Sequence, residues 1–165
     1  MRYLRIENTQ EDCILDDVDY LVYSQFKWRV QRRDNTIKAV IRGTYPKGGK
    51  YTTIYLHREI MGVTDPKVSV DHIDGNPLNN QRANLRLCNN AENHWNTKKP
   101  ANNTSGFKGV SWIKTGKRRK RWMAKIRKGK TFLTIGYYLT PEEAGIAYNN
   151  KAKELFGDFA RLNEI

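Results

Sequence analysis

Short stretches of alternating apolar and polar residues occupy the first third of the chain. The segments 3–6, 13–15 and 37–41 are rich in aliphatic, β-branched and aromatic residues, and turn-forming residues separate them. Alternation of this kind places one set of side chains on each face of a strand. Residues 1–55 are therefore predicted to form short β-strands, and the segments 37–41 and 51–55 to pair as a hairpin.

The last third of the chain combines strand patterns with one helix pattern. Three segments alternate apolar with polar or basic residues: 107–113, 121–128 and 130–138. Thr140, Pro141 and Glu143 then supply an N-cap, a first helical residue and a glutamate three residues after the cap. Apolar residues recur every three or four positions as far as Gly157, which is expected to end the helix. This pattern predicts a small three-stranded antiparallel sheet packed on one helix.

The middle of the chain predicts a strand, a loop, a second strand and a short helix. The apolar segments 68–72 and 85–88 are the predicted strands, and the turn residues of 74–77 begin the loop between them. Asn89 or Asn90 can cap the helix that follows. The predicted core of this part covers about residues 68–97.

These patterns together predict an α+β protein with two parts. The first part, residues 1–98, has a β-rich N-terminal region followed by the core described above. Residues 99–105 contain Pro, Gly and short polar side chains without apolar periodicity, and are interpreted as a linker. Residues 106–165 form the sheet-and-helix part.

The charge of the chain indicates the kind of partner that it binds. The net charge is +13 over 165 residues, and thirteen basic residues lie between Lys98 and Lys130. No acidic residue occurs between Glu92 and Glu142. A basic surface of this kind typically follows a phosphate backbone, so we expect double-stranded DNA as the partner. The run 117–121 is expected to contribute salt-dependent affinity with little sequence choice.

Other classes of protein are disfavoured. Cys13 and Cys88 are far apart and form no Cys-x-x-Cys pair, so a structural zinc site is not expected. There is no signal peptide and no apolar run of membrane length. We therefore expect an intracellular, cytoplasmic protein without membrane contact. No coiled-coil or apolar dimer face is evident, and we expect a monomer.

Three chemical groups stand out in the middle segment. Asp71 and His72 are adjacent at the end of the first predicted strand, and Asn93 lies in the first turn of the predicted helix. A strand, loop, strand and helix of this length can bring a carboxylate, an imidazole and a carboxamide to one point. Such a set can hold one hard divalent cation and deprotonate a water beside it.

The middle segment resembles the HNH nucleases, and most closely the homing type encoded by introns or phages. The matching residues are 56–58 (Leu-His-Arg), 70–75 (Val-Asp-His-Ile-Asp-Gly), 79–80 (Asn-Asn), 84–86 (Asn-Leu-Arg) and 92–93 (Glu-Asn). The resemblance implies that the core adopts the ββα-metal fold of that family. It also implies a Mg²⁺-dependent or Mn²⁺-dependent endonuclease that acts on DNA.

The family's motif also implies a role for each matching residue. His72 would be the general base, Asn84 the middle residue that holds the shape of the loop, and Asp71 and Asn93 the metal ligands. His94 is an alternative to Asn93 as the last ligand. His57 could approach the scissile phosphate or pack beneath the catalytic loop.

The last part of the chain resembles the plant ethylene-response-factor DNA-binding domain (the APETALA-two type). The matching residues are 106–110, 122–127, 135–138, 140 with 142–144, 147–149 and 160–163. In that family basic and aromatic side chains of the sheet contact DNA. The candidates here are Lys108, Trp112, Lys114, Arg119, Arg121, Lys125 and Arg127. Ser111 and Thr134 replace the Arg and Trp usual in the family, so its base preference does not carry over.

These observations predict a metal-dependent HNH DNA endonuclease, and more specifically a site-specific homing or nicking enzyme. One site per chain would cut one strand. The alternative is a non-catalytic, sequence-specific DNA-binding regulator, since the sheet-and-helix part alone would support that function. The complete set of Asp71, His72, Asn84 and Asn93 favours the enzyme.

Overall fold

The computed structural model describes residues 1–33, 36–44, 49–114 and 121–165. The chain is a mixed α/β protein that divides into two compact units, Met1–Asn90 and Ala91–Ile165. This division falls earlier in the chain than the predicted boundary at residue 98. The predicted linker lies inside the second unit, where the Asn103 side chain donates to the carbonyl of Phe107 and the Ser105 hydroxyl donates to that of Val110.

The first unit begins with a two-stranded antiparallel sheet and a short helix. Strand β1 (Arg2–Leu4) pairs with β2 (Cys13–Leu15), and α1 (Asp17–Tyr23) follows. The backbone of Ile14 then continues into the loop of the candidate site. Its N–H donates to the carbonyl of Leu78, and its carbonyl accepts from the N–H of Asn80. A strand near the N-terminus therefore fixes a loop more than sixty residues later.

A three-stranded antiparallel sheet forms the body of the first unit. Its order is β3 (Arg29–Arg33), β4 (Thr36–Thr44) and β5 (Thr52–Tyr55), so the predicted hairpin of the last two strands is present. Trp28 lies just before β3 and is completely buried. Its indole N–H donates to the carbonyl of Tyr23, which satisfies the only polar group of the ring.

The predicted strand, loop, strand and helix follow this sheet. Helix α2 (Leu56–Ile60) leads to β6 (Ser69–His72), which pairs antiparallel with β7 (Leu85–Cys88) after a single 3₁₀ turn, η1 (Arg82–Asn84). Helix α3 (Asn90–Trp95) comes next. The buried side chains of Leu56, Val70 and Leu85 belong to the same apolar core as Trp28. Burial of one face of the β6–β7 pair fixes its register.

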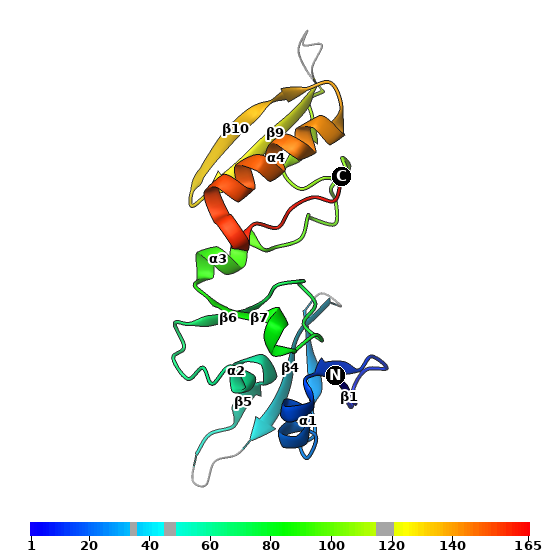
Figure 1. Ribbon diagram of the computed structural model, residues 1–165, viewed down its shortest axis with the longest axis vertical. Helices are drawn as coiled ribbons and strands as arrows, with labels where there is room; N and C mark the ends of the chain where they lie inside the picture. Colours follow the sequence, from blue (N-terminus) through cyan, green and yellow to red (C-terminus); the bar gives the residue numbers. More distant parts are fainter. Residues whose placement is uncertain (34–35, 45–48, 115–120) are drawn as a thin grey trace. The chain divides into compact units, whose positions relative to one another are not determined.

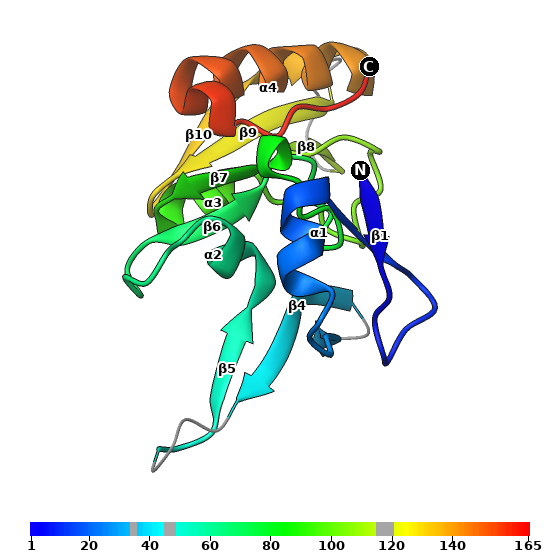
Figure 2. The same ribbon diagram turned by 60° about the horizontal axis from the view of Figure 1, so that its bottom comes forward.

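The second unit contains the predicted three-stranded sheet and helix. The strands β8 (Val110–Trp112), β9 (Trp122–Lys128) and β10 (Thr131–Tyr138) are antiparallel, with β9 in the centre. Helix α4 (Pro141–Phe156) lies across one face of this sheet (Figures 1 and 2). A second 3₁₀ turn, η2 (Gly157–Phe159), follows it.

The ends of α4 agree with the sequence prediction. The Thr140 hydroxyl accepts from the N–H of Glu143, and the Glu143 carboxylate accepts from the N–H of Leu139. Gly157 ends the helix with a positive φ of 53°. The helix packs through Ala144, Tyr148 and Ala152, as its spacing predicts, and also through Phe156.

The structure contains some of the predicted features and leaves others as predictions. The fold class, a combination of helices and several small sheets, is as predicted. The elements of a strand–strand–helix core are present, but α3 begins at the residue where the first unit ends, so the ββα-metal arrangement stays a prediction. No helix within the described ranges is long and apolar enough to cross a membrane.

Candidate active site

Asp71 and His72, the last two residues of β6, form the centre of the candidate site. Pairing with β7 sets Asp71 opposite Arg86 and His72 opposite Leu85. The two side chains are buried, at 7% and 9% exposed. Neighbouring residues of a strand point to opposite faces, and accordingly the aspartate and the histidine have different partners.

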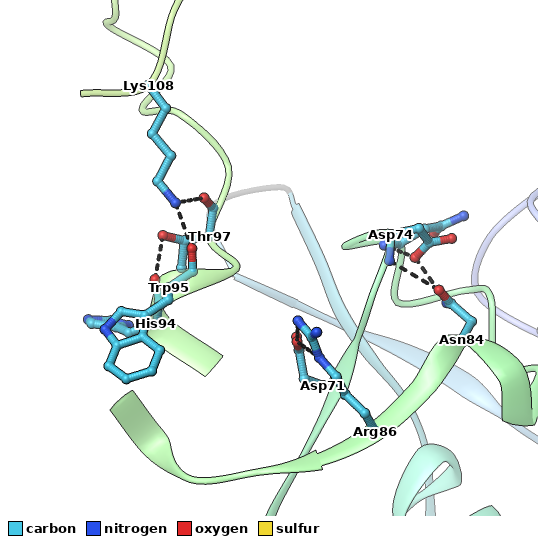
Figure 3. Close-up of polar contacts among 9 residues, drawn as sticks. Asp71, Asp74, Asn84, Arg86, His94, Trp95, Thr97 and Lys108 are labelled. Atoms are coloured by element: carbon cyan, nitrogen blue, oxygen red, sulfur yellow. Dashed lines mark hydrogen bonds and ion pairs between the residues drawn. The ribbon is translucent and has the colours of Figure 1, made fainter. Parts of the chain in front are cut away.

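The partner of Asp71 is Arg86. The guanidinium Nε and Nη2 donate to Oδ2 of Asp71 at 3.0 and 2.8 Å (Figure 3). Both side chains are largely buried, which makes this an internal ion pair rather than a surface one. Sequence reasoning assigned no role to Arg86. The antiparallel pairing of two four-residue strands is the signal that could have found it, because it sets residues 71 and 86 opposite each other.

The partner of His72 is Asn80, which is completely buried. The Asn80 Nδ2 donates to the carbonyl of Pro77 at 2.9 Å and contacts the Cys13 sulfur at 3.2 Å, so its Oδ1 is turned towards the imidazole. The His72 Nε2 lies 3.2 Å from this oxygen. We therefore assign the proton to Nε2, which leaves the lone pair on Nδ1.

A second histidine packs against the first. The ring of His57, from α2, meets the ring of His72 edge to face with centroids 5.3 Å apart. Burial, and to a smaller extent the charges of His72 and Arg58, lower the pKa of His57 from 6.5 to about 4. Burial is also the main cause that lowers the pKa of His72. The two imidazoles are therefore neutral at neutral pH.

Asn84 organises the start of the loop that follows His72. Its Oδ1 accepts from the N–H of Asp74, and its Nδ2 donates to Oδ1 of Asp74, each at 3.0 Å (Figure 3). The same Nδ2 donates to the carbonyl of Asn79 at 2.8 Å, and the Asn84 carbonyl accepts from the N–H of Ile73. These bonds join Asn84 to both ends of the loop, and its role in the site stays a prediction.

Asn93 belongs to α3, whose residues after Asn90 are part of the second unit. The ring of Trp95 stacks on Phe156 with centroids 4.5 Å apart and an interplanar angle of 14°. The ammonium of Lys108 donates to the carbonyls of Trp95 and Thr97 at the end of this helix, both at 2.7 Å (Figure 3). The second unit thus supports the helix that carries Asn93 and His94.

The described residues contain no group of three or more His, Cys, Asp and Glu side chains that could hold a metal ion. The predicted ligands, a carboxylate and a carboxamide, are a smaller set of a different kind. Their oxygen donors suit a hard divalent cation. The guanidinium beside Asp71 shows in addition that this buried carboxylate already accommodates a positive group.

Lys125 and Arg127 lie on the face of the second unit's sheet that points away from α4. Their neighbours in β9, Ala124 and Ile126, are buried on the helix side, so alternation directs the two cations to the opposite face. Phe132 is paired with Arg127 across the sheet and is 62% exposed. The Lys125 ammonium and the Arg127 guanidinium are each 5.4 Å from the centre of its ring. We call these three residues the open-face cluster.

The other predicted DNA contacts lie elsewhere. Trp112 is paired with Trp122 and shares the helix-side face of Val110, although it is 45% exposed at the edge of the sheet. Arg121 lies 5.8 Å from the Trp112 ring, and Lys114 is exposed. Arg119 lies outside the described residues. Lys108 is half-buried, and burial followed by the charge of Arg161 lowers its pKa to about 8.

Known proteins match this chain over the candidate site and beyond it. The family model described as HNH endonuclease matches residues 55–95. Protein 3.8 of Escherichia phage T7 is 36% identical over 141 residues, which cover 85% of this chain and 96% of the phage protein. An uncharacterized HNH endonuclease, L560 of Acanthamoeba polyphaga mimivirus, is 31% identical over 149 residues, or 87% of this chain and 70% of that protein. No solved structure matches.

A buried Asp-His pair at the end of a strand, followed by a loop and an antiparallel strand, thus lies in a segment that the family model covers completely. The chain belongs to the HNH endonuclease family, whose members act on DNA. The predicted family and enzyme class are confirmed at this level. The second resemblance, to the ethylene-response-factor domain, receives no support from these comparisons and stays a prediction.

Proposed function

We propose that this protein is a metal-dependent endonuclease that nicks double-stranded DNA at a specific site, with His72 as the general base. The observation that carries the proposal is the orientation of His72 by Asn80, beside the buried carboxylate of Asp71, within the segment that matches the HNH family. A general base has to be neutral and correctly oriented before the reaction begins, and His72 meets both conditions.

The protein's part in the chemistry follows from this orientation. The Oδ1 of Asn80 accepts a hydrogen bond from the Nε2–H of His72, so Nδ1 is the atom that takes a proton from the attacking water. The lowered pKa keeps the ring neutral at pH 7. Asn84 and Asp74 hold the loop on which this alignment depends.

Asp71 and Asn93, or His94 in place of Asn93, are the residues that we assign to the divalent cation, Mg²⁺ or Mn²⁺. When bound, such a cation stabilises the negative charge that develops on the phosphate and on the leaving oxygen. Hydrolysis with the 3′ oxygen as leaving group yields a 3′-hydroxyl and a 5′-phosphate.

The open-face cluster supports DNA binding by the second unit. Lys125 and Arg127 can reach phosphates, and the exposed ring of Phe132 keeps the two cations extended above the sheet. A narrow three-stranded sheet whose other face is covered by a helix can enter the major groove. With Lys114, Arg121 and the run 117–120, this unit would supply affinity and register on the duplex.

A homing role, in which a monomer recognises its own insertion site and cuts one strand there, extends the same proposal. It rests on the resemblance of residues 56–93 to homing nucleases. The competing function is that of a DNA-binding regulator that has lost catalysis. The open-face cluster favours neither, because both functions need DNA.

Nicking of supercoiled plasmid that carries the gene's natural flanking sequence tests the proposal. The wild type is expected to nick with Mg²⁺ and not with EDTA, and His72→Ala is expected to bind the plasmid without nicking it. Asn93→Ala and His94→Ala form a matched pair of neighbours on α3, and loss of nicking in one of them identifies the last ligand. Binding by every variant without nicking by any would favour the regulator.

A further inference from the structure

Among the described residues of the first unit, two arginine–aspartate pairs have a buried carboxylate, and they differ in the exposure of the arginine. Arg82 donates from Nε to Oδ2 and from Nη2 to Oδ1 of Asp19, at 2.9 and 2.8 Å, so its two nitrogens face both carboxylate oxygens. Arg86 donates from Nε and Nη2 to Oδ2 of Asp71, at 3.0 and 2.8 Å. The first arrangement is the fork that maximises a static pair. The second pair involves the carboxylate that we assign to the cation.

The second pair is more deeply buried than the first. The Asp71 and Arg86 side chains are 8% and 16% exposed, whereas Arg82 is 56% exposed. A buried carboxylate needs a positive partner, and Arg86 supplies one. A divalent cation at Asp71 would compete for the same negative charge and would repel the guanidinium across a short distance of low dielectric.

We propose that Arg86 is a positioning residue that holds Asp71 while no cation is bound and thereby weakens cation binding in the absence of DNA. An arriving phosphate offers the guanidinium a second anion with matching oxygen geometry. Transfer of Arg86 to that phosphate releases Asp71 to the cation. Cation binding then depends on the presence of DNA. The complete metal site therefore forms only when the enzyme is bound to its substrate. This inference rests on the proposed role of Asp71 as a cation ligand.

Mn²⁺ binding to the full-length chain without DNA tests the inference. Arg86→Met keeps the apolar stem and removes the charge. We expect it to bind Mn²⁺ at least about tenfold more tightly than the wild type, measured by electron paramagnetic resonance of free Mn²⁺. Arg86→Met is also expected to unfold at a lower temperature than the wild type, and Mn²⁺ is expected to restore most of that loss.

Arg82→Met is the matched control. It also leaves a buried aspartate without its arginine, but Asp19 is not an assigned ligand, so Mn²⁺ should not restore its melting temperature. The double variant Asp71→Asn with Arg86→Met should lose the tighter binding. If Arg86→Met does not fold, Arg86→Lys replaces it, because lysine keeps the charge and loses the paired donors. An intermediate Mn²⁺ affinity is then expected.

A short DNA duplex completes the test. It should raise the Mn²⁺ affinity of the wild type more than that of Arg86→Met, in which Asp71 is already released. Equal Mn²⁺ affinity of the wild type and the arginine variant, or equal rescue of Arg82→Met, would overturn the inference. Nicking by the wild type with such a result would leave the nuclease proposal intact. Conversely, tighter Mn²⁺ binding without nicking would support Arg86 and count against the nuclease.

Discussion

His57 and His72 meet edge to face with 5.3 Å between their ring centroids, although fourteen intervening residues separate them in the chain. The Nδ1 atom of His57 is buried and has no hydrogen-bond partner among the described residues. Protonation of His57 would place a charge against the ring that we propose as the general base. The fold therefore favours two neutral imidazoles.

Acid should destabilise the first unit because of this pair. The pKa of His57 is lowered from 6.5 to about 4, so the unfolded chain binds a proton that the folded chain refuses. The contribution of His57 is complete above about pH 6.5 and is lost as the pH falls towards 4, by up to about 3 kcal/mol. The free energy of unfolding, measured in urea across this pH range, should depend less on pH for His57→Phe than for the wild type. His94→Phe, at an exposed position, is the control, and equal slopes for the wild type and His57→Phe would contradict the prediction.

Replacement of Asn80 should disturb His72 without disturbing DNA binding. Asn80→Ala removes an acceptor from Nε2 of His72 and a donor from the carbonyl of Pro77, all buried, at an expected cost of about 2–3 kcal/mol in unfolding free energy. Nicking should slow by about 10²-fold, because the general base loses its orientation.

Asn79→Ala is the matched control for Asn80. The side chain of Asn79 bonds to Asp74 in an exposed position. Its loss should cost about 1 kcal/mol or less and leave nicking close to the wild-type rate. Equal effects of the two substitutions on nicking would refute the orienting role of Asn80.

The open-face cluster predicts a salt-dependent contribution to DNA affinity. Removal of two phosphate contacts by Lys125→Ala with Arg127→Ala should reduce the slope of log affinity against log salt by about 2. Lys151→Ala with Lys153→Ala removes the same charge from α4, on the opposite side of the sheet, and should change the slope less. Fluorescence anisotropy of a labelled duplex at several salt concentrations measures both. An identical decrease for the two pairs would show that only net charge matters.

Substitution of two glycines in the second unit should distinguish the cost of backbone strain from the cost of steric overlap. Gly109 and Gly129 both have positive φ, 76° and 61°, which costs alanine about 1–2 kcal/mol. A Cβ at Gly109 would also run into the ring of Tyr148 and lie 2.7 Å from the carbonyl of Lys125, whereas no described residue has an atom within 4 Å of one at Gly129. Thermal unfolding should therefore show a clearly larger loss for Gly109→Ala than for Gly129→Ala. Similar losses would mean that Tyr148 can move aside.

Local chemistry explains which parts were predictable from the sequence. The cap of α4 needs only Thr140 and Glu143, and the β6–β7 pair needs only two apolar stretches joined by a turn. Asn84 was recognisable because the loop that it closes is short. In each case the partners lie close together in the chain.

The parts that were missed depend on distant partners. Asn80 bonds to Pro77 in its own loop, but its orientation also depends on Cys13, 67 residues earlier. The attachment of α3 depends on Phe156, which no local pattern connects to Trp95. The resemblance to the ethylene-response-factor domain made Trp112 a candidate DNA contact, yet its pairing with Trp122 puts it on the helix side of the sheet.

The support of α3 by Lys108 and Phe156 has a consequence for how such enzymes can be divided and recombined. The segment that matches the family model, 55–95, ends inside the second compact unit, so the sequence signature is not itself a folding unit. A fragment that stops at residue 98 retains Trp95 but lacks both the ring that stacks on it and the ammonium that caps its helix. Chimeras that exchange DNA-targeting parts should therefore be joined before Asn90, so that α3 stays with Phe156 and Lys108, which support it.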